Sequence, residues 1–138
     1  MPHREAVILV VEDNPVIRIC SLDLLRSAGF VALEASDADE AIRIMEARSD
    51  IRLVFTDIGM PGTMDGIKLA HYIRDRWPAV KLIVASGSAI VSQSHLPAGA
   101  KLFPKPYAES SIVEAMVGML PDAKSGNPDT SAIRVGPA

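Results

Sequence analysis

Residues 6–15 read Ala-Val-Ile-Leu-Val-Val-Glu-Asp-Asn-Pro: six apolar side chains, then two acids, an amide and a proline. Six consecutive apolar residues are typical of a strand that a parallel sheet buries on both faces. Asn14 is a good helix cap, and Pro15 suits the first position of the helix that it caps. The stretch therefore predicts a buried strand, an acidic pair at its carboxyl end, and a helix.

The helix that follows is expected to end at Gly29. Within it, Ile17, Cys20, Leu24 and Ala28 form one apolar stripe at helical spacing. Because Cys20 lies among these apolar residues, we expect it to be a small packed side chain. As the chain has one cysteine, an internal disulfide and a site with several cysteine ligands are both excluded.

The same alternation of apolar runs and helical stretches continues along the chain. Four further strands are expected, at residues 30–34, 51–56, 80–85 and 100–103. Helices are expected from Asp37, as the cap, to about residue 48, and at about residues 66–76 and 108–120, whereas residues 88–96 offer only a short helix. Strands alternating with helices predict an α/β fold built on a parallel sheet.

Size and composition point to one globular domain. The chain has 138 residues, of which 49% are hydrophobic and 22% charged. A net charge of −3 gives no reason to expect nucleic-acid binding, and no apolar run is long enough for a membrane span. With no signal peptide recognised, we expect a cytoplasmic protein with a folded unit at residues 5–120, a tail at 1–4 and a disordered tail at 121–138.

Reactive side chains stand where the predicted strands end. Glu12 and Asp13 follow the first strand, Asp57 the third, Ser86 the fourth and Lys105 the fifth. The carboxyl ends of parallel strands meet at one edge of the sheet, where ligands bind in this class of fold. We therefore expect three acids, a hydroxyl and an ammonium on one rim.

This set of groups suits transfer of a phosphoryl group. Two carboxylates ~5 Å apart repel by roughly 3 kcal/mol at an effective dielectric of ~20, and Mg²⁺ relieves such crowding. A carboxylate such as Asp57 can act as a nucleophile and form an acyl phosphate. Lys105 and Ser86 would bind the phosphoryl oxygens. Each feature alone is more often a cap, a turn or a surface charge; their combination at successive strand ends carries the hypothesis.

The chain resembles the CheY-like receiver domains of two-component response regulators, of the single-domain type. The resemblance covers about residues 5–120 and rests on five motifs: Val10-Val11-Glu12-Asp13-Asn14, Thr56-Asp57-Ile58-Gly59-Met60-Pro61, Met64-Asp65-Gly66, Val84-Ala85-Ser86-Gly87 and Lys105-Pro106-Tyr107. It implies a doubly wound, five-stranded parallel sheet in the flavodoxin-like order 2-1-3-4-5.

The resemblance also implies roles for single residues. Asp57 matches the phosphorylated aspartate, and Asp13, Asp57 and the Gly59 carbonyl match the Mg²⁺ ligands, with Glu12 acting through water. Ser86 and Lys105 match the groups that hold the phosphoryl oxygens. The bond between Lys105 and Pro106 is commonly cis in the family. The implied donor is a histidine kinase or a histidine phosphotransfer protein, and the output would be binding to another, unidentified protein.

The chain departs from the family pattern at the expected output surface. Leu102 stands three residues before Lys105, where the family often has an aromatic side chain that follows the motion of the hydroxyl. The loop from Met60 to Asp65 carries one extra residue, and the fourth helix is short. The two-state element is expected in the loop after Ser86 together with the surface from Ala89 to Tyr107.

Other functions remain open at this point. A receiver would assist its own phosphorylation and dephosphorylation but would not be an enzyme; it could also be a phosphate sink or an unphosphorylated scaffold. An aspartyl phosphatase would need an acid or base two residues after Asp57, where Gly59 stands. A nucleotide-binding loop is lacking after the first strand. His3, His71 and His95 are expected to be solvated or packing residues.

Overall fold

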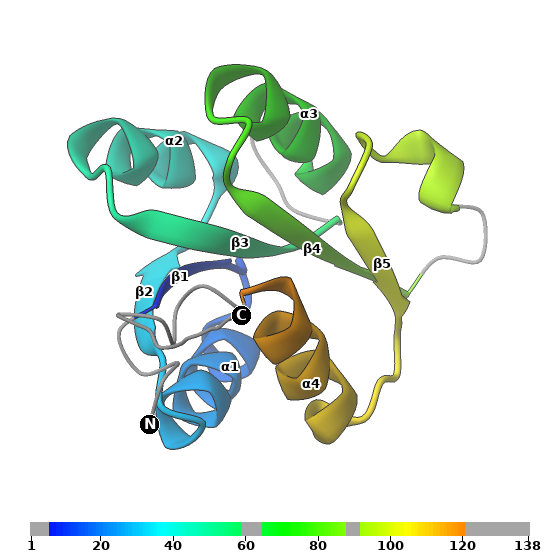
Figure 1. Ribbon diagram of the computed structural model, residues 1–138. Helices are drawn as coiled ribbons and strands as arrows, with labels where there is room; N and C mark the ends of the chain where they lie inside the picture. The colour runs from blue at the N-terminus through cyan, green and yellow to red at the C-terminus, as the bar shows by residue number, and fades with distance from the viewer. Residues whose placement is uncertain (1–5, 59–64, 88–91, 121–138) are drawn as a thin grey trace, which may run out of the picture.

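The computed structural model of the protein describes residues 6–58, 65–87 and 92–120. In these residues five strands and four α-helices alternate along the chain (Figure 1). The strands are β1 (Val7–Val11), β2 (Val31–Ala35), β3 (Ile51–Asp57), β4 (Lys81–Ser86) and β5 (Lys101–Pro104). The helices are α1 (Pro15–Ser27), α2 (Ala38–Ala47), α3 (Gly66–Arg76) and α4 (Glu109–Met119), with a 3-10 helix, η1 (Gln93–His95).

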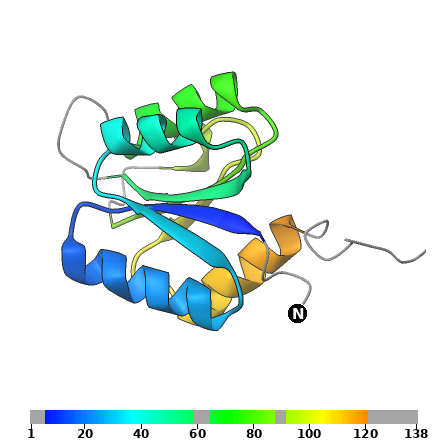
Figure 2. The same cartoon turned by 90° about the vertical axis from the view of Figure 1, so that its left-hand side faces the viewer.

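The strands form one parallel sheet in the order β2-β1-β3-β4-β5, which confirms the expected topology. Helices α2 and α3 cover one face of the sheet, and α1 and α4 cover the other (Figures 1 and 2). Each strand begins and ends within one residue of its predicted bounds. Among the described helices, none combines the length and the apolar character that crossing a membrane requires.

The strand register places the carboxyl ends of the central strands side by side. Val11 pairs with Thr56, so the residues that follow β1 lie next to Asp57. Ser86 pairs with Pro104, so the residue after β5 lies beside the end of β4. The register alone therefore gathers the reactive side chains at one edge of the sheet.

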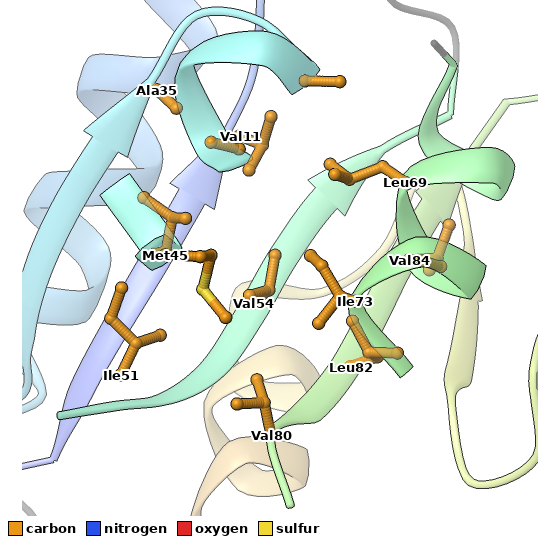
Figure 3. Close-up of a cluster of buried hydrophobic side chains, with 14 of the residues drawn as sticks. Val11, Ala35, Met45, Ile51, Val54, Leu69, Ile73, Val80, Leu82 and Val84 are labelled. Atoms are coloured by element: carbon orange, nitrogen blue, oxygen red, sulfur yellow. The ribbon is translucent and has the colours of Figure 1, made fainter. Parts of the chain in front are cut away.

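Two hydrophobic clusters hold the layers together. One lies between the sheet and helices α2 and α3, where Met45, Val54 and Ile73 meet (Figure 3). The other lies against α1 and α4 and includes Leu25 and Ile112, both fully buried. Burying one such side chain contributes about 1.5–3 kcal/mol to folding. The sheet is thus covered on both faces, as the apolar β1 run predicts.

Side-chain caps fix where three of the helices begin. Asn14 Oδ1 accepts hydrogen bonds from the backbone N–H groups of Val16 (2.9 Å) and Ile17 (3.2 Å). Asp37 Oδ1 caps α2 and Asp65 Oδ1 caps α3 in the same way. A cap of this kind contributes about 1 kcal/mol, so the acids and amides between elements set the helix boundaries.

The predicted inward face of α1 was wrong. Cys20 is exposed and Ile17 is 42% exposed, whereas Ser21, Leu22 and Leu25 are the buried residues of the helix. The helix has apolar side chains on more than one face, so its periodicity does not single out the one that meets the sheet. Packing against β1 and β2 decides it, and the predicted stripe is left largely on the surface.

The expectation of a short helix between β4 and β5 is confirmed for the residues described there, where η1 spans a single turn. Residues 88–91 lie outside the described part of the chain, as do both terminal segments, 1–5 and 121–138. The predictions about the two tails therefore stay predictions.

Candidate functional site

Three carboxylates meet at the carboxyl edge of the sheet. Glu12 and Asp13 follow β1, and Asp57 ends β3. One carboxylate oxygen from each residue lies within 4.8 Å of the others. Glu12 is buried, while Asp13 and Asp57 are half-buried. At this spacing each pair of charges repels by about 3 kcal/mol at an effective dielectric of 20, so the cluster favours a cation.

Burial and neighbouring acids raise the pKa of Glu12 above its ordinary value. Loss of solvent is the main cause, and Asp57 and Asp13 raise the pKa further. The Asn14 backbone N–H, which donates to Glu12 Oε2 at 3.1 Å, and the charge of Lys105 oppose this rise. The ionised form of Glu12 is therefore less favourable than in water, and a bound cation would stabilise it.

Lys105, which follows the edge strand β5, forms an ion pair with Asp57. Lys105 Nζ lies 3.1 Å from Asp57 Oδ1, and the Ile58 backbone N–H donates to the same oxygen at 2.9 Å. The side chains of Lys105 and Asp57 are 31% and 15% exposed, so water still reaches the pair. Positive charge thus stands where a phosphoryl oxygen would have to be received.

Ser86 ends β4 beside this pair and is buried, 4% exposed. The backbone N–H of Lys105 donates to the Ser86 carbonyl at 2.7 Å, which ties the residue with the hydroxyl to the residue with the ammonium. The bond between Lys105 and Pro106 is cis, as the resemblance to the family suggested. The structure therefore brings together the Glu12, Asp13, Asp57, Ser86 and Lys105 positions expected at this rim.

Tyr107 forms a wall of the site that the sequence did not reveal. It lines a small pocket with Glu12, Asp57 and Lys105, and its ring packs edge-on against Phe55, with centroids 6.2 Å apart. Burial is the main reason that the pKa of its phenol is raised, and the carboxylates of Glu12 and Asp57 raise it further. The only sequence signal is its place directly after Lys105 and Pro106.

Gly66 allows α3 to approach the aspartate strand closely. A Cβ atom at this position would lie 2.2 Å from the Asp57 carbonyl oxygen and 2.6 Å from the Ile58 Cα. The Gly66 N–H also donates to the Ile58 carbonyl at 3.0 Å. Only glycine fits this contact, so the residue fixes how β3 passes into the helix. In the sequence, Gly66 is part of the Met64-Asp65-Gly66 motif, but the sequence alone gives no physical reason for a glycine there.

An apolar surface borders the site on α1. Val16 is 68% and Ile19 56% exposed. Between α1 and α4 lies a groove of ≈ 140 Å³, lined by Val16, Ile17, Cys20, Ser21, Leu24, Tyr107 and Glu109. Tyr107 belongs both to this groove and to the pocket at Asp57. The groove and the acidic cluster are therefore neighbours that share one side chain.

Gly59, expected to offer a carbonyl to the metal, lies outside the described residues, as does His3. His71 and His95, distant in sequence, meet between α3 and η1, where His71 Nε2 lies 2.9 Å from the His95 carbonyl oxygen. Both histidines are exposed, and the contact joins a helix to a turn, in keeping with the solvated or packing role expected for them.

Comparison with known sequences places this arrangement in context. A family model described as the response regulator receiver domain matches residues 8–117. Sensor kinase CckA of Brucella abortus (strain 2308) is 34% identical over 119 residues, covering 83% of this chain and 12% of the kinase. Response regulator protein FleR of Pseudomonas aeruginosa is 27% identical, covering 89% of this chain and 27% of FleR. The chain thus spans about a quarter or less of these curated relatives.

Solved structures show the same fold. The receiver domain of hybrid histidine kinase CckA is 31% identical with a TM-score of 0.71, and the match covers 83% of this chain and 99% of that domain. Response regulator TrrA of Thermotoga maritima, solved in complex with Mg²⁺ and BeF, is 25% identical with a TM-score of 0.74. That match covers 84% of this chain and all of TrrA.

Proposed function

Because the chain belongs to the response regulator receiver domain family, we propose that Asp57 accepts a phosphoryl group from a histidine kinase or a histidine phosphotransfer protein. The observation that carries the proposal is the geometry around this residue. Asp57 shares a cluster of three carboxylates, with ligand oxygens within 4.8 Å, and lies 3.1 Å from the Lys105 ammonium. Asp57 thus has acids beside it that could hold a metal ion, and the Lys105 ammonium beside it that could bind the phosphoryl oxygens.

The donor set of the cluster fits Mg²⁺. Its groups are carboxylate oxygens, which are the ligands that this hard cation takes in proteins. Asp13 and Asp57 would bind it directly, and Glu12 through a water molecule. When bound, Mg²⁺ supplies positive charge that offsets both the carboxylates and the phosphoryl oxygens. The Mg²⁺ and BeF held by the related TrrA structure support this assignment.

The residues of the chain account for the transfer step. A carboxylate oxygen of Asp57 attacks phosphorus while the P–N bond of the donor breaks and its electron pair goes to the leaving imidazole nitrogen. The product is an acyl phosphate on Asp57. Lys105 and the Ser86 hydroxyl would bind the non-bridging oxygens of the transferred phosphoryl group, by charge and by hydrogen bond. The phosphoryl group replaces one negative charge by about two and adds acceptor oxygens. These new contacts would favour a second conformation of the chain after Ser86.

The phosphoryl donor would approach over α1. A histidine on a partner protein must reach Asp57, so the partner has to cover the surface around the site. The exposed Val16 and Ile19 and the groove beside Tyr107 offer apolar contacts there. An exposed apolar patch next to a reactive group is typical of an interaction surface, which supports a protein donor. The output protein remains to be identified.

Two further expectations belong to this proposal. Residues 5–120 form the receiver unit, and the cytoplasm is its expected location. The sequence also led us to expect a regulator that works as a separate protein, whereas the curated relatives carry this region within longer chains. An immunoblot that measures the length of the native protein in its cells tests this last point.

The intact mass of the protein after incubation with Mg²⁺ and acetyl phosphate tests the phosphorylation. We expect a gain of one phosphoryl group that a chelator abolishes. Asp57→Ala should gain none, whereas Asp23→Ala, which removes an exposed acid of α1, should behave as the parent does. A parent that gains no mass, even with several histidine kinases as donors, would instead indicate an unphosphorylated scaffold.

A further inference from the structure

The side chain of Gln93 occupies the open edge of the sheet. Strand β5 is an edge strand of the described sheet, so within the described residues no strand pairs with the N–H and C=O groups on its outer side. The Gln93 Nε2 group donates to the Ala100 carbonyl, and the Leu102 N–H donates to Gln93 Oε1 at 3.2 Å. A carboxamide carries the same donor and acceptor as a peptide group. Gln93 therefore takes the place that a sixth strand would take.

Polar contacts rather than packing hold the turn that carries Gln93. The Ser92 N–H donates to His95 Nδ1 at 2.9 Å, and His71 of α3 reaches the His95 carbonyl. Residues 92–95 are exposed, and Leu96 is the buried residue that follows them. A segment with solvent-exposed hydrogen bonds and few buried apolar contacts opens more readily than the rest of a fold.

In the sequence, the turn that carries Gln93 lies between Ser86, at the end of β4, and Leu102 in β5. Residues 87–92 connect it to Ser86, the buried residue that ends β4 at the carboxyl edge of the sheet. A Cβ atom at Gly87 would meet no described atom within 4 Å, so the space beside the chain is open directly after Ser86. Leu102 stands where the family often uses an aromatic ring for coupling, and here Gln93 holds its backbone N–H instead.

We propose that the Gln93 carboxamide is a latch, closed on β5 while Asp57 is unphosphorylated and released when Ser86 binds the phosphoryl group. The inference rests on the proposed function. New contacts at Ser86 act on the turn that begins at Ser92, and the exposed hydrogen bonds of Gln93 are the ones that yield. Release uncovers the Ala100 carbonyl and the Leu102 N–H, so the edge of β5 changes its hydrogen-bonding surface with the state of Asp57.

Amide hydrogen exchange of the full chain, resolved by residue with NMR, tests the latch. In the parent, the Leu102 N–H should exchange at least about tenfold faster when Mg²⁺ and acetyl phosphate are present. The N–H groups of Lys101 and Phe103 face β4 instead, because successive residues of a strand alternate, and their exchange should not change. Intact mass measured on the same samples reports how much of the chain is phosphorylated.

Three variants separate the latch from the turn around it. In Gln93→Ala, the Leu102 N–H should exchange rapidly even without phosphorylation, and phosphorylation should increase its exchange rate only a little. Gln93→Glu keeps the size of the side chain but places an oxygen against the Ala100 carbonyl, so it should also be open. Ser94→Ala changes an exposed side chain of the same turn that bonds Ser92, and it should behave as the parent does.

Different results would overturn different steps. Equal Leu102 exchange in the parent and in Gln93→Ala would show that Gln93 does not protect the edge. Full phosphorylation by mass with unchanged Leu102 exchange would show that the latch is not coupled to Asp57. A chain that gains no phosphoryl group would overturn the proposed function itself, and with it the release of the latch.

Discussion

The Lys105 ammonium and the Asp57 carboxylate form an ion pair at 3.1 Å, although the two residues are 48 positions apart in the chain. Asp57 comes from the centre of the sheet and Lys105 from the end of its edge strand. The pair forms because the register of β4 and β5 sets Pro104 opposite Ser86. The Asp57 carboxylate, the proposed phosphoryl acceptor, is thus held beside a cation in the structure.

Lys105→Met should slow phosphorylation by acetyl phosphate about 10²-fold, because it removes a charge that receives the phosphoryl oxygens. The fold should lose less than about 1 kcal/mol, since the ion pair is partly exposed to water. Time courses of intact mass and urea titrations measure the two effects. Lys101→Met, which removes an exposed lysine of β5, is the matched control. Equal rates for both variants would remove Lys105 from the mechanism.

Gly66→Ala should destabilise the protein by about 2 kcal/mol or more, because its Cβ would overlap the backbone of Asp57 and Ile58. Phosphorylation should also fall, since α3 would push on the end of β3. Gly118→Ala is the control: it lies in the last turn of α4 and its Cβ meets no described atom within 4 Å, so it should not destabilise the protein. Denaturant unfolding with both variants decides, and a stable, active Gly66→Ala would contradict the model of a close approach.

Mg²⁺ should raise the thermal midpoint of the parent. A ligand that binds only the folded state at a hundredfold excess over its Kd stabilises by about 2.7 kcal/mol. Asp13→Asn should lose most of this gain because it removes a direct ligand, whereas Asp23→Asn makes the same charge change on the exposed surface of α1 and should keep it. Calorimetry with and without Mg²⁺ measures the difference. A similar gain in both variants would indicate nonspecific binding.

The raised pKa of Tyr107 predicts a loss of stability in alkali. Burial, followed by Glu12 and Asp57, raises this pKa in the folded state. The folded chain therefore keeps the phenol proton at a pH where the unfolded chain releases it, so stability falls as pH rises through and above about 10, the ordinary tyrosine pKa. Tyr107→Phe should show a shallower loss than the parent and than Tyr72→Phe. Urea unfolding between neutral and alkaline pH checks it; identical slopes would contradict it.

The course of the sheet and the position of the reactive residues follow from local sequence patterns. An apolar run such as Val7–Val11 predicts a strand wherever it lies, and parallel strands put their carboxyl ends together. Once the ends of β1 and β3 were known, the meeting of Glu12, Asp13 and Asp57 followed. The roles of these residues in phosphorylation stay predictions until the mass experiment is done.

Features that depend on contacts across the fold were not predictable in this way. The buried side of α1 is chosen by packing on the sheet, so the periodicity gave the wrong side for Cys20. The role of Gly66 depends on the backbone of Asp57, which is near it only in space. Gln93 looked like one polar residue of a loop, and its bonds to β5 arise only when the chain has turned back on the sheet edge.

The hydrogen bond from the Lys105 backbone N–H to the Ser86 carbonyl, at 2.7 Å, gives the two residues that we propose to bind the phosphoryl group a common mechanical support. The hydroxyl and the ammonium stand on main chain that is joined directly, so a displacement of one strand end is passed to the other. A substitution that shifts the backbone at either Ser86 or Lys105 should therefore weaken phosphoryl binding by both side chains.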